Sequence, residues 1–417
     1  MRGFSRVAAK DSSAAPRLLL VLFLVLIGCQ RTSGIPLQGM WSGTVELKEG
    51  KVLPFQMNLD FSGAKPAGYF LNGNEKTPIP EIAREGDSVI LGFSEYSAEV
   101  RATWDGARLN GTYNRIRSSG TTSLKFTAAP GAASETPASG ALPAGNFQVI
   151  FQGEDKVDDT TLAKFWSKDG SVYGTLIAPD GDYGLLAGRP AGNRIQLNRF
   201  TGWQATVIEL ENSGGAWSGK FYAASNDKPR SFILQPRAGL SLAPAAAQQT
   251  AMKNPNAEFV FSGMSLSGET VRNTDDRFKG KALIVDIMGT WCHNCLDESP
   301  VLQQLQQKFG KDGFEVVGLS FEISDDPALA KKNLQLYKDR FGLTYTLLFC
   351  GSLDDANVMK QIHSQLDNFF AYPTAIFIDK NHKVRSVHSG FKGPGTGEEF
   401  QTQIREFQEL THKLIVE

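Results

Sequence analysis

The stretch that decides the fold is residues 282–295, Ala-Leu-Ile-Val-Asp-Ile-Met-Gly-Thr-Trp-Cys-His-Asn-Cys. Its first half is an apolar run with one acid, Asp286, and such a run is typical of a buried strand. Cys292 and Cys295 follow where the strand is expected to give way to a helix. The free N–H groups and dipole of a helix N-terminus favour the thiolate, which is the form that attacks disulfides. The stretch therefore predicts a redox-active dithiol.

The chain around this motif, from residue 256 to 417, alternates apolar and amphipathic segments. Alternation of this kind predicts an open α/β sheet. The expected strands are 282–288, 314–321, 344–349, 374–379 and 383–388, and the expected helices are 294–310, 326–341, 353–366 and 397–415.

The Trp-Cys-x-x-Cys motif resembles that of the thioredoxin superfamily, as does Tyr372-Pro373-Thr374 before an apolar strand. Within that superfamily the chain is most similar to the TlpA/ResA group of exported thiol–disulfide oxidoreductases. Glu298 and Pro300 after the second cysteine carry this similarity, together with Gly-Phe-Lys-Gly-Pro-Gly at 390–395. The resemblance covers only residues 256–417 and implies a thioredoxin-like domain there.

The two cysteines of the motif have different expected roles. Cys292 at the helix N-terminus is expected to be the exposed nucleophile, and Cys295, one turn in, the buried thiol that resolves the mixed disulfide. Trp291 either shields the thiolate and contacts partner chains or simply packs. The alternative for the pair is an inert disulfide or half of a metal site. No second Cys-x-x-Cys or close His pair completes a zinc site, so we expect no metal and no cofactor.

The resemblance implies that Pro373 is a cis-proline. It would place the Tyr372 backbone beside the dithiol, where it can pair with an extended substrate strand. An ordinary turn proline before a strand is the alternative.

The resemblance implies that Asp286 and Glu298 are candidate proton carriers for Cys295. A lone buried carboxylate such as Asp286 is costly and should have a raised pKa, which suggests a function. Glu298 lies three residues after Cys295, on the same face of the expected helix. The alternative for Asp286 is a carboxylate that is satisfied by backbone donors or water. The alternative for Glu298 is a solvated glutamate on the helix. The sequence does not rank the two acids.

His293 and Asn294 fill the dipeptide that tunes the redox potential. A cationic His293 would stabilise the Cys292 thiolate and favour oxidant behaviour. We expect His293 to be exposed, and an exposed histidine can be neutral near pH 7. Cys350 follows an apolar run and is either a third redox thiol or, as we expect, a small buried residue at a strand end.

The N-terminus predicts export. Arg2, Arg6, Lys10 and Arg17 precede the apolar run 18–27, which is short for a membrane span and typical of a signal peptide. Leu-Ile-Gly-Cys at 26–29 resembles the bacterial lipobox, in which the cysteine is lipidated. We expect a signal peptide at 1–28, lipid on Cys29 and a tether at 29–36. A plain secretory signal with an incidental cysteine is the alternative.

Between the tether and residue 256 the chain reads as β structure with many Gly, Asn and Asp turns. We expect a β-rich repeat at 37–128, a linker at 129–145, a second β-rich repeat at 146–237 and a linker at 238–255. The two β segments share similar blocks, such as 86–93 and 192–200, which indicates a duplication. No convergent catalytic set stands out in either one.

The formal net charge of −1 indicates no nucleic-acid partner. We therefore expect a thiol–disulfide oxidoreductase, lipid-anchored in the bacterial cell envelope and facing the periplasm or the outside. Its expected partners are disulfide-bearing proteins, a membrane thiol donor of the DsbD/CcdA kind, and the bilayer through Cys29. The resemblance favours reduction, with cytochrome c maturation as one setting. A β-repeat binding lipoprotein with an accessory redox domain, or a thiol peroxidase, are the alternatives.

Overall fold

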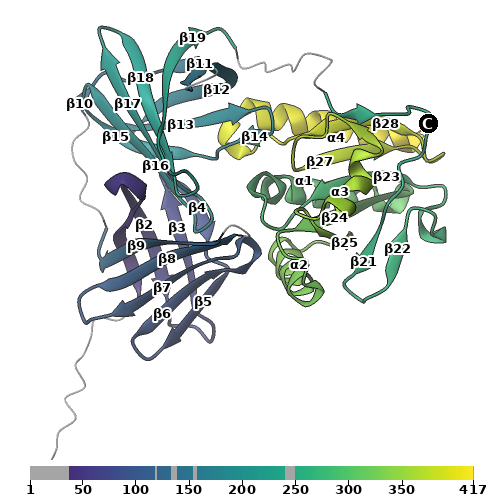
Figure 1. Ribbon diagram of the computed structural model, residues 1–417, viewed down its shortest axis with the longest axis horizontal. Coiled ribbons are helices and arrows are strands. Elements are labelled where there is room, and N and C mark those ends of the chain that lie inside the picture. Colours follow the sequence, from purple (N-terminus) through teal and green to yellow (C-terminus); the bar gives the residue numbers. More distant parts are fainter. Residues whose placement is uncertain (1–36, 118–119, 133–138, 154–156, 240–248, 417) are drawn as a thin grey trace, which may run out of the picture. The chain divides into compact units, whose positions relative to one another are not determined.

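The computed structural model describes residues 37–117, 120–132, 139–153, 157–239 and 249–416 (Figure 1). The predicted signal peptide, Cys29 and the tether lie outside these residues. Within them, none of the helices combines the length and the apolar composition that crossing a bilayer requires.

The first sheet is an antiparallel meander with the strand order β4-β3-β2-β1-β9-β8-β7-β6-β5. Its strands alternate buried and exposed side chains, as in β2, where Leu53, Phe55, Met57 and Leu59 point into the core. The strands are β1 (Gly39–Glu46), β2 (Val52–Asp60), β3 (Ala67–Asn72), β4 (Glu75–Pro78), β5 (Glu81–Glu85), β6 (Ser88–Phe93), β7 (Ala98–Trp104), β8 (Leu109–Arg117) and β9 (Gly120–Pro130).

The second sheet closes on itself, because β13 pairs with β15 and β19 pairs with β11. Its strands are β10 (Ser139–Gly140), β11 (Gly145–Gln152), β12 (Val157–Lys168), β13 (Ser171–Ala178), β14 (Gly181–Asp182), β15 (Leu186–Gly192), β16 (Arg194–Phe200), β17 (Ala205–Ser213), β18 (Ala216–Ala223) and β19 (Arg230–Arg237). Both sheets run as meanders whose last long strand returns beside the first. A duplication would produce this shared order, and the duplication itself stays a prediction.

The two sheets share an aromatic core. Phe200, at the end of β16, is 1% exposed and lies among rings of the first sheet. Its ring centroid is 4.7 Å from that of Phe70, 5.0 Å from Phe55 and 5.3 Å from Tyr113. The Asn72 side chain fixes the same residue, accepting from the Phe200 N–H at 2.9 Å and donating to its carbonyl at 3.2 Å. The β segments are therefore packed together rather than strung apart.

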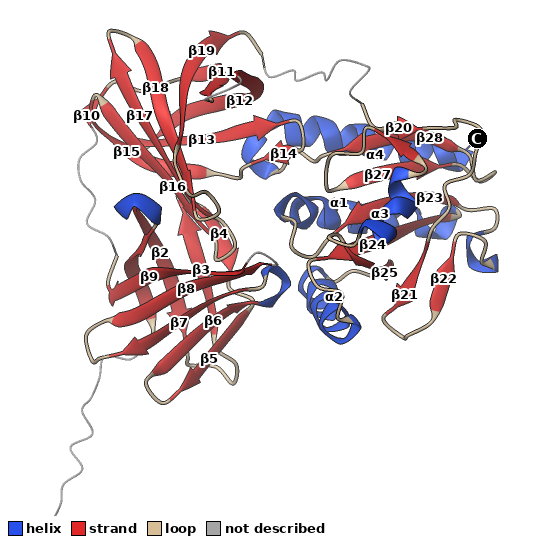
Figure 2. Ribbon diagram, viewed as in Figure 1, coloured by secondary structure: helices blue, strands red, loops and turns tan. Residues whose placement is uncertain are grey.

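The C-terminal part is a mixed sheet with the strand order β22-β21-β25-β24-β23-β27-β28, and helices accompany it (Figure 2). Its strands are β21 (Ser262–Ser265), β22 (Thr270–Arg272), β23 (Ala282–Met288), β24 (Phe314–Glu322), β25 (Thr346–Ser352), β27 (Thr374–Ile378) and β28 (Val384–Ser389). Its helices are α1 (His293–Phe309), α2 (Pro327–Phe341), α3 (Ala356–His363) and α4 (Glu398–Val416). The strands and helices expected from the sequence lie at these places within a few residues.

Strand β23 lies in the centre of this sheet and every one of its side chains is buried. It pairs in parallel with β24 and antiparallel with β27. Ile284 and Met288 belong to the core shared with α1 and α4, whereas Val285 and Ile287 belong to the core shared with α3. A strand buried on both faces has a continuous apolar sequence, which explains the run at 282–288. A short strand β20 (Ala251–Met252) pairs with β26 (Leu366–Asp367), inside the predicted second linker.

Candidate active site

The dithiol lies where β23 ends and α1 begins, as the sequence predicts. Cys292 is the N-cap of α1, and its sulfur accepts a hydrogen bond from the backbone N–H of Cys295 at 3.3 Å. Cys295 is fully buried, and burial is the main cause that raises the pKa of its thiol well above the usual range. The neighbouring Cys292 raises that pKa further. Cys295 therefore needs a base before it can act as a nucleophile.

The expectation of an exposed Cys292 is wrong. Cys292 retains 6% exposure and belongs to the same buried cluster as Tyr96, which lies between β6 and β7 of the first sheet. Tyr96 lies in the short 3₁₀ helix Ser94–Tyr96, whose Glu95 carbonyl accepts a hydrogen bond from the Thr290 hydroxyl at 3.4 Å. The segment that forms the two large β sheets, called the β part from here on, therefore buries this side of the dithiol motif. Nothing in the sequence of residues 256–417 indicates this contact.

The segment before β27 approaches the dithiol from the other side. The Tyr372–Pro373 peptide bond is cis, as predicted. The Cys292 thiol donates to the Tyr372 carbonyl at 3.3 Å, so this backbone lies beside the sulfur. The Tyr372 ring packs edge-on to Trp291 with centroids 5.3 Å apart. Trp291 is itself anchored by a hydrogen bond from its Nε1 to the Phe321 carbonyl at 2.8 Å.

Asp286 and Glu298 come together beneath the dithiol. Asp286 lies on β23 and Glu298 on α1, and both are buried to 1% exposure or less. Burial is the main cause that raises the pKa of Asp286 to about 7 and that of Glu298 well above its usual range. Among the described residues, no donor reaches either oxygen of Asp286. The charge of Asp286 raises the pKa of Glu298 further, because a second negative charge close by is unfavourable.

The raised pKa values of Asp286 and Glu298 therefore favour forms in which at least one of the two acids is protonated. The charge of Asp286 raises the pKa of Cys295, which shows that the acid and the thiol are electrostatic neighbours. Because two like charges at close range cannot both ionise easily, the pair titrates as a unit. This is the chemistry that a proton acceptor for the buried thiol requires.

Two tyrosines near Cys295 carry no signal in the sequence motif. The Tyr337 hydroxyl, from α2, donates to the Cys295 carbonyl at 2.8 Å and lies 2.7 Å from the Ser299 hydroxyl. Tyr345 is buried and its pKa is raised well above the usual range, mainly by burial and then by the charge of Asp286. Only the packing of α2 and of the segment before β25 against α1 places these phenols at the site.

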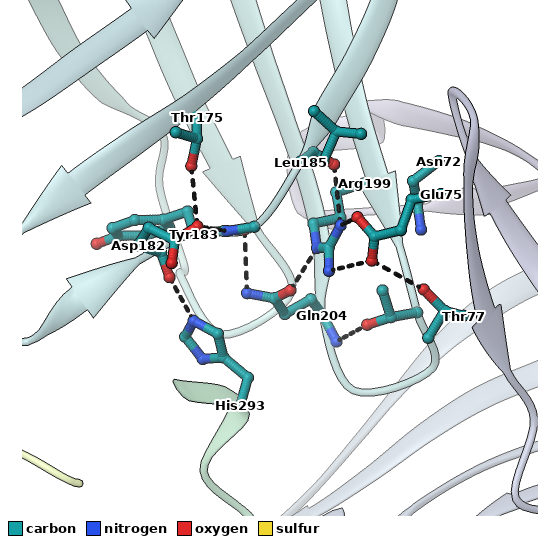
Figure 3. A network of polar contacts seen from close by, with 12 residues as sticks. Asn72, Glu75, Thr77, Thr175, Asp182, Tyr183, Leu185, Arg199, Gln204 and His293 are labelled. Carbon is teal, nitrogen blue, oxygen red and sulfur yellow. Dashed lines mark hydrogen bonds and ion pairs between the residues drawn. The ribbon is translucent and has the colours of Figure 1, made fainter. Parts of the chain in front are cut away.

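The dipeptide between the cysteines contacts the second sheet. His293 Nε2 lies 2.5 Å from the carbonyl oxygen of Asp182 (Figure 3), and the Asn294 side chain donates to the Asp180 carbonyl at 3.0 Å. Burial lowers the pKa of His293, so the ring is neutral near pH 7. The expectation of an exposed His293 is wrong, because the side chain is half-buried against Asp182 of β14.

The β14 turn also binds the loop after β28. Gly181 forms a parallel bridge with Phe391, and the Gly393 N–H donates to the Asp182 carboxylate at 2.6 Å. Gly181 has a φ of 141°, and a Cβ there would lie 2.0 Å from the Asn294 amide nitrogen. Only glycine fits this close approach. Asp182 and Gly181 are functional neighbours of the dithiol that sequence reasoning missed, because they lie over 100 residues away on another sheet.

Cys350 lies at the end of β25 and is half-buried. Burial raises the pKa of its thiol to about 12. Its sulfur lies 3.6 Å from the Ser262 carbonyl, in the core that β23 shares with α3. Cys350 is thus placed as the small residue at a strand end that the sequence predicts. In the described ranges, no group of three His, Cys, Asp or Glu side chains is arranged to hold a metal ion.

Comparison with known proteins shows which protein family the C-terminal part matches. Residues 248–404 match the model of the family described as Redoxin. The C-terminal part is a redoxin domain. It is similar to the thioredoxin-like protein YneN of Bacillus subtilis, with 29% identity over 132 residues that cover 31% of this chain and 68% of the relative.

The redoxin domain is also similar to the thiol–disulfide oxidoreductase ResA of Geobacillus thermodenitrificans, at 29% identity over 32% of this chain and 66% of the relative. A solved thioredoxin-family thiol:disulfide interchange protein from Chlorobium tepidum TLS aligns at 23% identity, with a TM-score of 0.30, over 40% of this chain and 99% of that one. The matched relatives cover only the C-terminal portion. That portion is a thioredoxin-like thiol–disulfide oxidoreductase domain of the ResA/TlpA kind.

Proposed function

We propose that this chain is a membrane-anchored, extracytoplasmic enzyme that reduces protein disulfides through Cys292 and Cys295. The observation that carries the proposal is the position of Cys292, which caps α1 beside the Tyr372 carbonyl with Cys295 one turn behind it. A helix N-terminus is where a thiolate is best stabilised. The backbone at Tyr372 offers an extended substrate strand a place to pair.

The reaction proceeds in two displacements. The Cys292 thiolate attacks one sulfur of the substrate disulfide, the S–S bond breaks, and one substrate thiolate leaves. The Cys295 thiol then gives its proton to the Asp286–Glu298 pair and attacks Cys292. The Cys292–Cys295 disulfide forms, the second substrate thiolate leaves, and two electrons have passed to the substrate. A thiol donor, proposed to be a membrane protein of the DsbD/CcdA kind, returns the dithiol to its reduced form.

The location follows from the N-terminal sequence. The lipobox-like segment ending at Cys29 supports a lipid anchor on the cell envelope. Cytochrome c maturation is one setting in which such a reductase would work. Metabolic labelling with a palmitate analogue in wild-type and Cys29→Ala cells tests the anchor, and label that survives the substitution would argue against it.

The activity is tested by following insulin reduction with dithiothreitol as the electron source. We expect turnover that Cys292→Ser abolishes and Cys350→Ser leaves unchanged. Equal rates for wild type and Cys292→Ser would disprove the proposal. The reduction potential of the couple then gives the direction: a value near ~−270 mV fits a reductase, and one near ~−120 mV an oxidant.

A further inference from the structure

A cavity of about 570 Å³ lies where the two β sheets meet the redoxin domain. The turn before β4 contributes Asn74 and Glu75, the second sheet contributes Trp166 and Arg199, and the redoxin domain contributes Asp297 and the segment 394–397. Cavities of this volume with a few convergent polar groups are typical of small-ligand sites. Neither the dithiol nor the segment at Pro373 lines it, so the cavity is separate from the redox site.

The basic groups of the cavity are already paired. Arg199 makes a two-pronged ion pair with Glu75, at 2.8 and 3.1 Å, and also donates to the Leu185 carbonyl and the Gln204 side chain (Figure 3). Lys164 donates to the Thr396 carbonyl at 3.2 Å and lies 3.6 Å from the Glu399 carboxylate. Because Arg199 and Lys164 are already paired with carboxylates, neither is available to bind an anionic ligand.

Asp297 is an acid of the cavity without an ion-pair partner of its own, because Arg199, whose charge acts on it, is already paired with Glu75. It lies on α1, two residues after Cys295, and no hydrogen bond or ion pair joins its carboxylate to another of the described residues. The neighbouring Asp182 carboxylate is satisfied by the N–H groups of Gly393 and Gly184. Burial, and then the charge of Asp182, raise the pKa of Asp297 well above its usual range. A cation bound beside Asp297 would therefore stabilise its ionised form.

The wall of the cavity favours an organic cation over a metal ion. Trp166 is half-buried, stacks on Tyr173 with ring centroids 6.0 Å apart, and contributes aromatic surface to the lining of the cavity. Indole rings attract ammonium and guanidinium groups. A metal ion would require several oxygen or nitrogen ligands around one point, and the described part of the chain has no such cluster.

We propose that this cavity binds an organic cation, an ammonium or guanidinium group, with Asp297 as its counter-ion and Trp166 as its aromatic wall. The group could be presented by a basic side chain of a bound peptide or by a free amine. Binding of this cation does not depend on the dithiol, so it stands apart from the reductase proposal.

Calorimetric titration of the full chain at pH 8 tests the site with three probes. N-acetyl-arginine amide stands for a peptide-borne cation, agmatine for a free amine, and N-acetyl-citrulline amide is the neutral control of the same shape. We expect at least one cationic probe to bind ten or more times more tightly than the citrulline compound. Tight binding of agmatine would identify free amines as the source, and binding of the arginine compound alone would identify peptides.

Two variants connect this binding to the cavity. Asp297→Asn should weaken the cationic probe at least tenfold, and Trp166→Leu should weaken it by a smaller factor. Asp312→Asn, an exposed acid of the same domain, should leave it unchanged. Far-UV circular dichroism establishes whether each variant is folded. If Asp297→Asn does not fold, Trp166→Leu alone tests whether the probes bind in the cavity. Equal binding of charged and neutral probes, no binding of either cation, or an unchanged affinity in both cavity variants would overturn the proposal.

Discussion

His293 Nε2 lies 2.5 Å from the carbonyl oxygen of Asp182, so a residue between the two cysteines is held by a strand of the second sheet. Asn294 and the loop after β28 are held by the same turn. Because Cys292 is also nearly buried, the arrangement restricts what can reach its sulfur. Large substrates require the β part to move or local contacts to break.

Loosening the β14 turn should therefore expose Cys292. In Gly181→Ala the new methyl group would collide with the Asn294 side chain, since a Cβ there lies 2.0 Å from its nitrogen. We expect bulky maleimides to alkylate the reduced dithiol about tenfold faster than in wild type, the factor that corresponds to ~1.4 kcal/mol lost from the closed arrangement. Iodoacetamide should show a smaller change.

Gly192→Ala is the matched control for this change. Gly192 also has a positive φ, but nothing lies within 4 Å of the Cβ position. It tests backbone strain in the same sheet without the collision. Equal acceleration in both glycine variants would show that the contact with Asn294 does not limit access.

The Asp286–Glu298 pair should make stability fall as the pH rises. The folded-state pKa of Asp286 is raised from 3.8 to about 7. Between these values the folded protein binds more protons than the unfolded chain, so the free energy of unfolding decreases with pH. Asp286→Asn removes part of that dependence and should be more stable than wild type at pH 8, by up to about 4 kcal/mol. Urea unfolding at pH 4, 6 and 8 measures the difference.

The same substitution should slow the redox reaction. Without Asp286, the Cys295 thiol loses a proton acceptor, and resolution of the mixed disulfide should slow by about 10²-fold. Stopped-flow measurement of tryptophan fluorescence during oxidation of the dithiol follows this step across pH. Glu298→Gln separates the two acids, and unchanged rates in both variants would exclude them as proton carriers.

Cys350 should be inert toward thiol reagents. Its pKa of about 12 leaves almost no thiolate at pH 8, and the thiolate is the reactive form. Mass spectrometry after a short iodoacetamide pulse of the reduced, folded protein should find label on Cys292 and none on Cys350. Rapid labelling of Cys350 would contradict this prediction and would support a role for Cys350 as a third redox thiol.

Phe200 should be among the residues that stabilise the β part most. It is buried among Phe55, Phe70 and Tyr113 of the other sheet. Phe200→Ala should cost about 3–5 kcal/mol, because it removes a large ring from a packed core. Ile233→Ala, at a position of the second sheet that is 40% exposed, should cost less than ~1 kcal/mol. Similar losses for the two variants in denaturant unfolding would contradict the shared core.

The redoxin domain could be predicted from local patterns because its chemistry is local. The apolar run at 282–288, the spacing of Cys292 and Cys295, and the proline at 373 each act through a single strand, turn or helix terminus. Periodicity and helix capping depend on neighbouring residues, so they can be read along the chain. The proximity of Asp286 and Glu298 also follows, because a central strand and the next helix pack together.

What only the tertiary structure decided is how the β part meets the dithiol. Asp182 and Gly181 lie in a short turn like many others, and Tyr96 in a brief 3₁₀ segment. The burial of Cys292, the neutral His293 and the cavity at Asp297 all depend on contacts between segments more than 100 residues apart. Such contacts arise from shape and desolvation over whole surfaces, which leave no periodic mark in the sequence. The sequence alone determined the chemistry of the dithiol, and the packing of three sheets determined what can reach it.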